Sequence, residues 1–447
     1  MTLTDGEGDA QLWPLHDRLV ATVESVRRYG TRVTLDVDAA YDADVLLSES
    51  FTTLPGRRPP VDAVSNFLGG YVPEGRHREV MAATRRVDKD DLFALLREFG
   101  GSIAGAVTLR PPDEPATYRP RCEPLDDGAV SARLRQALDA SDQAIGDDSR
   151  STLPGDQPKV LVARMDGQWL YPHGRAHSTH LLKPQVPSRP SRLVDEHDSH
   201  LLTQRLGLSN DASEIRRAQS TTYLAIERSD RTVADGAVRP LHPEDLAQAL
   251  RLDWRETDTK FQDSDWPDDP RRATLRHIAE LLGSVPGGDA AVEQWLRALT
   301  FHVAIGNNDA HATNVALLHL SMGTELAPVY DALPKLFQAG LVKWDLALAV
   351  DGIFDHRRVS VEGLLAEAQS WGGDRRGASV GAGHRDTRRP RRGAHGDRRA
   401  RGGFARHDRA SAVDRSPTSR GRGDRRTDAV RDESRGCHHT GDTLAAA

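Results

Sequence analysis

Apolar and polar positions alternate early in the chain and then take on a helical period. Segments 18–26 (RLVATVESV) and 30–38 (GTRVTLDVD) have the period of two that is typical of half-buried strands. Segment 89–100 (KDDLFALLREFG) has the spacing of an amphipathic helix. Strands followed by helices predict a small α/β domain, which we assign to residues 1–112.

A Pro-rich stretch and a polar helix come next and predict a linker over residues 113–148. The period of two returns in segment 159–172 (KVLVARMDGQWLYP), where Asp166-Gly167 is typical of a hairpin turn.

Further strands are expected in 177–185 (HSTHLLKPQ) and 221–230 (TTYLAIERSD), with an amphipathic helix between them at 192–208. Beyond Pro240 the pattern is helical in segments 242–252, 271–283 and 290–305, and a last apolar stretch covers 346–371. Strands followed by helices predict an α+β domain of two lobes with a cleft between them, over residues 149–372.

The pattern ends after Trp371. Residues 373–447 contain no Lys, Ile, Met, Trp or Tyr and a single Leu. Such a segment cannot bury enough apolar area to offset its ordering entropy, so we expect a disordered Arg/Gly-rich tail. Two interpretations stay open, a natural basic tail and the out-of-frame translation of a GC-rich gene. The abrupt change favours the second, and truncation after Trp371 is expected to leave nucleotide affinity nearly unchanged.

The net charge of −6 conceals an asymmetry between the tail and the rest of the chain. The tail has 19 Arg and 10 acidic residues, whereas residues 1–372 have 41 basic and 56 acidic residues, a net charge of −15. An acidic body of this kind does not favour direct binding to nucleic acid or to an anionic membrane.

The two cysteines, Cys122 and Cys437, exclude a disulfide framework or a Cys-based zinc site and fit a reducing compartment. The acidic N-terminus lacks the apolar segment of a signal peptide, and no run of about 18 apolar residues occurs. We therefore expect a cytoplasmic protein without a membrane span.

Short polar side chains crowd together in segment 305–314 (IGNNDAHATN), directly after an apolar helix. Asp309 and Asn314 have the D-x-x-x-x-N spacing by which protein kinases place the catalytic base and a magnesium ligand on one loop. Asp331 follows a short apolar strand, and Lys183 closes the strand at 177–185. These residue types predict phosphoryl transfer. Asp309 would be the general base, Asn314 and Asp331 the magnesium ligands, and Lys183 the phosphate-facing ammonium.

Each of these residues also has a purely structural explanation. Asp309 could belong to a turn, and Asn314 could be an N-cap. Lys183 could be a solvated strand end, and Asp331 could start the turn at Pro334. All four occur in order on the expected elements of one domain, which favours the functional explanation.

Over residues 17–371 the chain resembles the HipA family of serine/threonine kinase toxins. The first domain contains FLGGYVPEGRHREVM and DDLFALLREFGGSIAGAV. The second contains, in family order, TLPGDQPKVLV, STHLLKP, LAIERSDR, HPEDLAQAL, IGNNDAHATN and LAPVYDALP. The resemblance implies a two-lobed protein-kinase-like domain with a mostly helical C-terminal lobe, and ATP and Mg2+ as cofactors.

The resemblance also implies roles for particular residues. The segment TLPGDQPK resembles a Gly-rich phosphate loop, whose members near the nucleotide would be Pro154, Gly155, Asp156, Gln157, Pro158 and Lys159. The position that the family autophosphorylates corresponds to Thr152, with Ser151 beside it. Further ATP contacts would come from the adenine hinge at Glu227, Arg228 and Ser229, and from His311, Asn314, Tyr330 and Asp331.

Three positions depart from the family pattern, which has a serine at Thr152 and usually an aromatic residue at Ser229 and a lysine at Thr313. The last two predict weaker stacking on the adenine and weaker electrostatic support for the transferring phosphate. Glu196, on the helix after Lys183, could pair with that lysine, although an exposed acidic helix face is the alternative.

The leading hypothesis is a serine/threonine protein kinase that acts as the toxin of a toxin–antitoxin pair. The resemblance implies that it phosphorylates a translation factor such as an aminoacyl-tRNA synthetase. It also implies a HipB-like helix-turn-helix antitoxin as partner, through which any DNA contact would be made. The alternatives are a catalytically impaired pseudokinase that acts as corepressor with the antitoxin, and, less favoured by the acidic body, a lipid kinase.

Overall fold

The computed structural model describes residues within the unit Met1–Gly383, namely 10–13, 19–26, 30–41, 46–111, 120–140, 157–234, 237–338 and 343–372. The tail expected to be disordered lies outside these residues.

The N-terminal domain is built on a four-stranded antiparallel sheet with the strand order β3-β2-β1-β4. Its strands are β1 (Ala10–Trp13), β2 (Ala21–Ser25), β3 (Val33–Val37) and β4 (Thr108–Arg110), and its helices are α1 (Val61–Gly69), α2 (Gly75–Arg85) and α3 (Leu92–Phe99). Alternating residues such as Val23 and Leu35 enter a core that also contains Phe67 and Leu92. The expected α/β character of this domain is confirmed.

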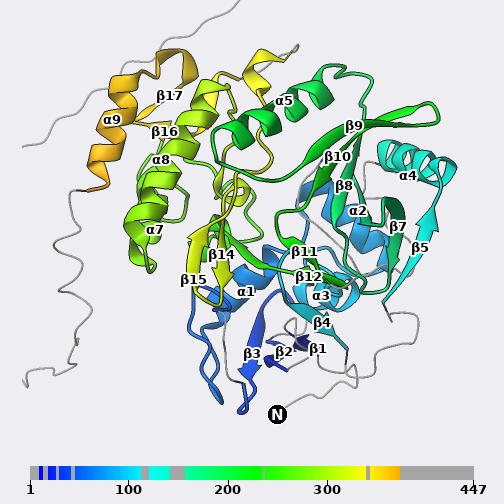
Figure 1. The fold of residues 1–447 in the computed structure, drawn as a ribbon. Helices are drawn as coiled ribbons and strands as arrows, with labels where there is room; N and C mark the ends of the chain where they lie inside the picture. Colours follow the sequence, from blue (N-terminus) through cyan, green and yellow to red (C-terminus); the bar gives the residue numbers. More distant parts are fainter. Residues whose placement is uncertain are drawn as a thin grey trace, which may run out of the picture. The chain divides into compact units, whose positions relative to one another are not determined.

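The second domain begins with a six-stranded antiparallel sheet of order β5-β7-β6-β8-β10-β9 (Figure 1). The strands are β5 (Arg121–Leu125), β6 (Val160–Met165), β7 (Gln168–His173), β8 (His180–Pro184), β9 (Ser213–Ala218) and β10 (Thr221–Glu227). The β6–β7 hairpin turns at Asp166 and Gly167, whose φ angles of +50° and +80° are those the sequence signal predicts for a two-residue turn.

Two helices, α4 (Asp127–Ala140) and α5 (Arg192–Arg205), cover opposite faces of this sheet. The alternation along β10 explains the arrangement. Tyr223 and Ala225 pack with residues of α4, whereas Leu224 and Ile226 pack against Leu193 of α5.

A linker was expected at residues 113–148. The part of it that the structure describes, residues 120–140, belongs to the second domain instead. Strand β5 pairs with β7 in the register Arg121↔His173 to Leu125↔Trp169, and α4 packs on the sheet. Residues 121–124 are all exposed, so they lack the alternation that identifies a strand from sequence.

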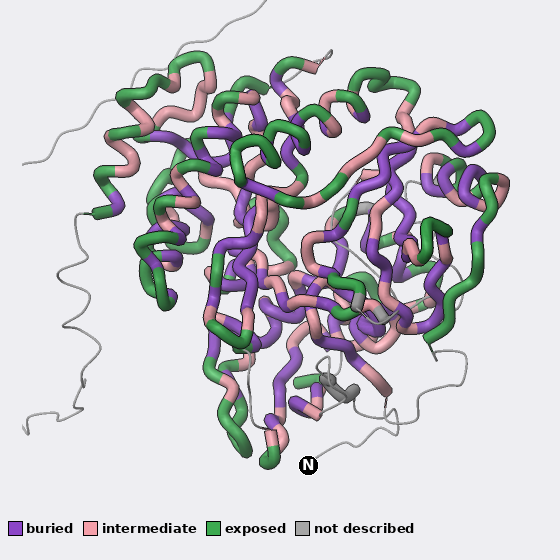
Figure 2. Tube along the Cα trace, viewed as in Figure 1, coloured by how far each residue is buried: buried purple, intermediate pink, exposed green. Residues whose placement is uncertain are grey.

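The C-terminal lobe is mostly helical, as expected. It contains α6 (Leu246–Ala249), α7 (Leu275–Ser284), α8 (Gly288–Ala304) and α9 (Val361–Ser370), with the short strands β13 (His242–Asp245), β14 (Ala316–Leu320), β15 (Gly323–Leu326), β16 (Asp345–Val350) and β17 (Ile353–Asp355). Its core surrounds Trp295 of α8, which is fully buried. Figure 2 shows that α9 lies at the surface, in agreement with the lack of buried residues along that helix.

Two local predictions are wrong. The helix expected at 242–252 begins with strand β13, which pairs with β14 in the register His242↔His319 to Asp245↔Ala316. A partner more than 70 residues away overrides the local helical pattern. The strand expected directly before Asp331 ends earlier, at Leu326.

Two further short strands, β11 (Arg231–Ala234) and β12 (Ala237–Pro240), pair with each other. In chain order they lie between β10 and β13. Among the described residues, no helix is both long and apolar enough to cross a membrane.

Candidate active site

Lys183 lies on β8, a strand inside the six-stranded sheet with β6 and β10 as neighbours. Its buried ammonium forms an ion pair with Glu196 of α5 and donates a hydrogen bond of 3.1 Å to Asp331 Oδ1. Burial lowers the pKa of Lys183, but the carboxylates of Glu196 and Asp331 outweigh it, so the pKa is raised overall. Lys183 is therefore a protonated, buried cation, and its interpretation as a solvated strand end is wrong.

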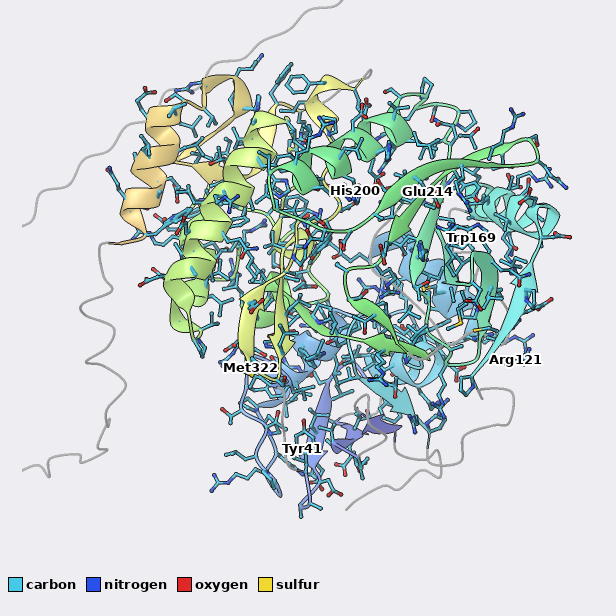
Figure 3. The ribbon with its side chains drawn as sticks, viewed as in Figure 1. Tyr41, Arg121, Trp169, His200, Glu214 and Met322 are labelled. Atoms are coloured by element: carbon cyan, nitrogen blue, oxygen red, sulfur yellow. The ribbon has the colours of Figure 1, made fainter. Side chains whose placement is uncertain are left out.

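Helix α5 brings Glu196 to Lys183 because its first turn is anchored on the sheet. Leu193 packs against Leu224 and Ile226, and a residue three positions later lies on the same side of the helix. Glu196 is 1% exposed, so the expected ion pair is present and the alternative of an exposed acidic face is wrong. His200, one turn further along α5, is also buried, and burial lowers its pKa (Figure 3).

The loop after α8 is held by hydrogen bonds among its own residues. The buried side chain of Asn307 contacts His302 Nδ1 at 3.0 Å and accepts a hydrogen bond of 3.1 Å from the Asp309 amide. The Asn314 side chain donates to the Asp309 carbonyl oxygen at 2.8 Å, and the His311 amide donates to the same oxygen at 2.9 Å. The Asp309 carboxylate takes no part in these bonds.

Asn314 is the last residue of a short 3-10 helix, η2 (Ala312–Asn314). The N-cap position of that helix belongs to His311, so the explanation of Asn314 as an N-cap is wrong. A side-chain amide binds a metal through its oxygen, and the bond to Asp309 within the loop uses only the nitrogen of Asn314.

Asp331 has a φ of +50°, in the left-handed region that residues other than Gly rarely adopt. Its side chain is 44% exposed. Lys183 lowers the pKa of this carboxyl well below its ordinary value against the opposing effect of burial, and Lys159 and Lys335 lower it further. Asp331 is therefore ionised at neutral pH, and it sits in a conformation of the kind that clusters at functional sites.

Tyr330 joins Asp331 to the loop, because its hydroxyl donates a hydrogen bond of 3.0 Å to the Thr313 carbonyl oxygen. The Thr313 hydroxyl contacts His311 Nδ1 at 2.9 Å, and His311 Nε2 lies 3.8 Å from Asp309 Oδ1. Burial lowers the pKa of His311 to about 4, so its ring is neutral at pH 7.

A turn that the sequence analysis did not single out completes this cluster. The 3-10 helix η3 (Lys335–Phe337) places Lys335 in an ion pair with the Asp309 carboxylate. The Leu336 amide donates to the Gly306 carbonyl oxygen at 3.1 Å. The signal that could have found Lys335 is composition, since the chain has only six lysines against 54 arginines.

The segment expected as the adenine hinge follows β10. The Glu227 amide donates to the Ala212 carbonyl oxygen at 2.8 Å, and the Arg228 amide donates to the Thr179 carbonyl oxygen at 3.0 Å. Both of these amides are therefore bonded within the protein, and the Arg228 carbonyl oxygen accepts a hydrogen bond of 3.2 Å from the Arg231 amide.

The guanidinium of Arg228 is buried against Asp230 and the Ser178 hydroxyl. Asp230 also binds Arg231, which donates to the carbonyl oxygens of Ile103 at 2.6 Å and Gly105 at 3.4 Å. The N-terminal domain therefore contacts the segment directly behind the hinge.

Part of the expected phosphate loop is described. Gln157 and Pro158 precede β6, and Lys159 is buried at the start of that strand, close enough to Asp331 to affect its pKa. The other members, Pro154, Gly155 and Asp156, and the expected phosphorylation positions Ser151 and Thr152 lie outside the described residues.

The donor set suits magnesium better than a metal held by protein alone. Among the described residues, no group of three or more His, Cys, Asp or Glu side chains gathers as a metal site. Magnesium prefers oxygen ligands and is commonly held by one or two carboxylates together with phosphate oxygens. The carboxylate of Asp331 and the amide oxygen of Asn314 fit this pattern.

Comparison with protein families gives two matches that together cover most of the described chain. The HipA N-terminal domain matches residues 14–110, and the HipA-like C-terminal domain matches residues 151–381. The chain belongs to the HipA family.

Curated relatives within and near this family carry kinase names. The chain is 34% identical to "Putative kinase Y4mE" of Sinorhizobium fredii, over 63% of this chain and 67% of that protein. It is 25% identical to the serine/threonine-protein kinase toxin HipA of Shewanella oneidensis, over 68% of this chain and 70% of that protein.

A solved structure confirms the HipA fold. The Shewanella oneidensis HipA, determined in a complex with HipB and operator DNA, superposes with a TM-score of 0.68 at 21% identity, over 81% of this chain and 84% of that one. The expected α+β fold with a kinase-like domain is therefore confirmed.

Proposed function

We propose that this HipA-family chain is an ATP-dependent serine/threonine protein kinase that acts as the toxin of a toxin–antitoxin pair. The observation that carries the proposal is the 3.1 Å contact between Lys183 of the sheet and Asp331 of the C-terminal lobe. Tyr330, the neighbour of Asp331, is bonded in turn to the loop that contains Asp309 and Asn314. These contacts support a phosphate-binding cation, two metal ligands and a base around one cleft.

In this mechanism Lys183 binds phosphate oxygens of ATP, while Asn314 and Asp331 hold magnesium. Bound magnesium neutralises negative charge on the phosphates. Asp309 accepts the proton of the substrate hydroxyl as the hydroxyl oxygen bonds to the γ-phosphorus and the bond from that phosphorus to ADP breaks. Glu196 keeps Lys183 in position, and Glu227, Arg228 and Ser229 line the adenine side.

The remaining elements of the proposal extend the family resemblance. The substrate is a protein, such as an aminoacyl-tRNA synthetase or another translation factor, and Thr152 or Ser151 is the autophosphorylation site. The partner is a HipB-like antitoxin, as in the Shewanella complex, and DNA is contacted through that partner. The chain acts in the cytoplasm, away from membranes.

The test is transfer of radiolabelled phosphate from ATP to the chain itself and to dephosphorylated casein. Asp309→Asn is expected to lower the rate by about 100-fold or more, because it removes the proton acceptor while keeping the shape of the side chain. Asp62→Asn, which removes an exposed partner of Arg32, is the matched control and should transfer label like the wild type. Equal labelling by Asp309→Asn would contradict the proposal.

A second candidate is the pseudokinase that serves as corepressor with its antitoxin. It is favoured by Thr313, which stands where the family has a lysine, and by the pairing of the Asp309 carboxylate with Lys335. Nucleotide binding without any transfer of label, together with tighter operator binding by the antitoxin in the presence of this chain, would select this candidate.

A further inference from the structure

Lysine is scarce in this chain, and it is concentrated at the candidate active site. Of the six lysines, Lys183 contacts Asp331, Lys335 pairs with Asp309, and the Lys260 carbonyl oxygen accepts a hydrogen bond of 3.2 Å from the Ala312 amide of the catalytic loop. Lys159 is buried directly before β6, in the expected phosphate loop. The remaining two, Lys89 and Lys343, are exposed elsewhere. Nearly all other cationic side chains of the protein are arginines, whereas four of its six lysines lie at or beside the candidate active site. A lysine ammonium is more compact than a guanidinium.

Lys335 differs from its neighbours in its partner. Lys183 is bound by Glu196 and Asp331, and Lys260 is paired with Glu74 at 2.5 Å. Lys335 is paired with Asp309, the proposed base, and both side chains are 30% exposed. The pair is therefore partly accessible to solvent, and in the proposed mechanism the substrate hydroxyl approaches Asp309.

The backbone that carries Lys335 is fixed against the catalytic loop. The Leu336 side chain is buried, and the Leu336 amide donates to Gly306 O at 3.1 Å. A Cβ at Gly306 would lie 2.6 Å from the Phe337 ring, so the turn packs directly on the loop. Gln338 then donates to Asp195 of α5 at 2.9 Å, which anchors the far end of the turn.

The catalytic loop itself offers no cation to the transferring group. Between Asp309 and Asn314 the residues are Ala310, His311, Ala312 and Thr313. The His311 ring is buried, and its Nδ1 atom lies 2.9 Å from the Thr313 hydroxyl. Phosphoryl transfer spreads negative charge over the three equatorial oxygens, and a positioned cation is a principal means of stabilising that charge.

We infer that Lys335 is a further catalytic residue, whose ammonium binds the γ-phosphoryl oxygens of ATP during transfer. This inference rests on the proposed kinase function. Without nucleotide the ammonium pairs with Asp309, and with nucleotide it contacts the phosphoryl oxygens beside that carboxylate. The proton of the hydroxyl goes to Asp309, and the bonding electrons of the broken P–O bond go to ADP.

The decisive measurement compares the affinities for ATP and ADP, each with magnesium, by calorimetry. ADP lacks the γ-phosphoryl group, so Lys335→Met should lower the preference for ATP over ADP by about tenfold, the effect of one charge-assisted contact. Lys335→Arg should keep most of the preference. Lys343→Met, an exposed lysine eight residues away, should bind both nucleotides like the wild type.

Asp309→Asn provides the sharpest control, because it breaks the same ion pair from the other side. It should keep the preference for ATP, whereas a merely structural pair predicts that both variants behave alike. In turnover assays Lys335→Met should lower kcat by about 100-fold and raise KM for ATP by up to about tenfold, because the contact to the γ-phosphoryl group is lost in both the bound and the transition state.

The outcomes separate the two proposals. If the wild type binds ATP but transfers no phosphate, the kinase proposal fails while the affinity ratio still tests Lys335. An unchanged ratio in Lys335→Met, in a variant whose thermal unfolding matches the wild type, overturns the role of Lys335.

Discussion

Asp245 is the N-cap residue of α6, and its surroundings disfavour the negative charge of its carboxylate. Its carboxylate accepts a hydrogen bond of 2.8 Å from the Gln248 amide, and the Gln248 side chain accepts one of 3.0 Å from the Asp245 amide. These two bonds form a capping box. Burial raises the pKa of Asp245 to about 7, with the nearby carboxylates of Glu244 and Glu74 acting in the same direction.

This shift predicts a pH-dependent gain in stability from Asp245→Asn. The folded pKa lies above the unfolded value, so the wild type loses stability as pH rises from about 4 to about 7. Asn keeps the cap and does not titrate. The melting temperature of the variant should exceed that of the wild type by several degrees at pH 8 and equal it at pH 4.

Asp355 is a control of opposite sign for this experiment. It begins the 3-10 helix η4 (His356–Arg358), and the hydrogen bond from Arg357 lowers its pKa to about 2. The stability from its charge is present above pH 4 and is lost as pH falls through the folded pKa, so Asp355→Asn should not stabilise the chain at pH 8. A similar gain in both variants would contradict the burial argument.

Single site residues could be predicted from the sequence where both their chemical type and their spacing indicate a catalytic role. Asp309, Asn314, Asp331 and Lys183 satisfy this condition. One bond between the lobes links Lys183 to Asp331, and a bond within the C-terminal lobe links Tyr330, the neighbour of Asp331, to the loop of Asp309. Lys335 does not satisfy it. Its neighbours read as an ordinary turn, and its partner Asp309 is 26 residues away.

Among the elements, the contact between the end of α8 and the turn η3 is the one on which the site depends most closely. Gly306, two residues after α8, has a φ of +68°, and its carbonyl oxygen accepts a hydrogen bond from the Leu336 amide of η3. The ring of Phe337 fills the space where a side chain at Gly306 would extend. A change at this glycine therefore acts on the turn that carries Lys335.

We predict that Gly306→Ala lowers phosphoryl transfer, whereas Gly352→Ala does not. Both glycines have positive φ, +68° and +73°, so both variants lose about 1–2 kcal/mol of stability from the left-handed backbone. Only Gly306→Ala adds a clash, because a Cβ at Gly352 meets nothing within 4 Å. Melting temperature and kcat, measured on both variants, separate the two effects, and equal kcat values would contradict the prediction.

Elements with a strong local period could be predicted from sequence, such as the β6–β7 hairpin and α5. Elements defined by a distant partner could not. The residues of β13 have a helical pattern, and the local sequence does not show their pairing with β14. Strand β5 is exposed along most of its length. The local pattern records burial, and an edge strand with little burial leaves no signal.

For the whole described unit, the contact between the N-terminal domain and the kinase-like domain contains a buried polar cluster beside the packing of Trp254 against the N-terminal core. Glu244 and His319 are both fully buried and 2.9 Å apart, and Glu244 also accepts hydrogen bonds from the Ser48 hydroxyl and the Glu49 amide. Gln248 donates to the Phe67 carbonyl oxygen. Such contacts lack a periodic apolar signature, so the sequence predicted two domains without predicting their interface.

We predict that Glu244→Gln destabilises the chain by about 3 kcal/mol, because an amide oxygen cannot replace both carboxylate oxygens and the amide nitrogen faces donors. Urea unfolding should show a lower midpoint. Glu24→Gln, which weakens an exposed pair with Arg58, should change the free energy of unfolding by less than about 1 kcal/mol. Comparable losses in the two variants would show that the buried contact has no special weight.

The reach of Arg231 into the loop that contains Ile103 and Gly105 has a thermodynamic consequence. Coupling between two sites is reciprocal. If the closed form of this loop increases the affinity of the hinge for a ligand, that ligand makes the opening of the loop less favourable by the same free energy. Amide hydrogen exchange at residues 102–105 would thereby report ligand binding at the proposed adenine hinge.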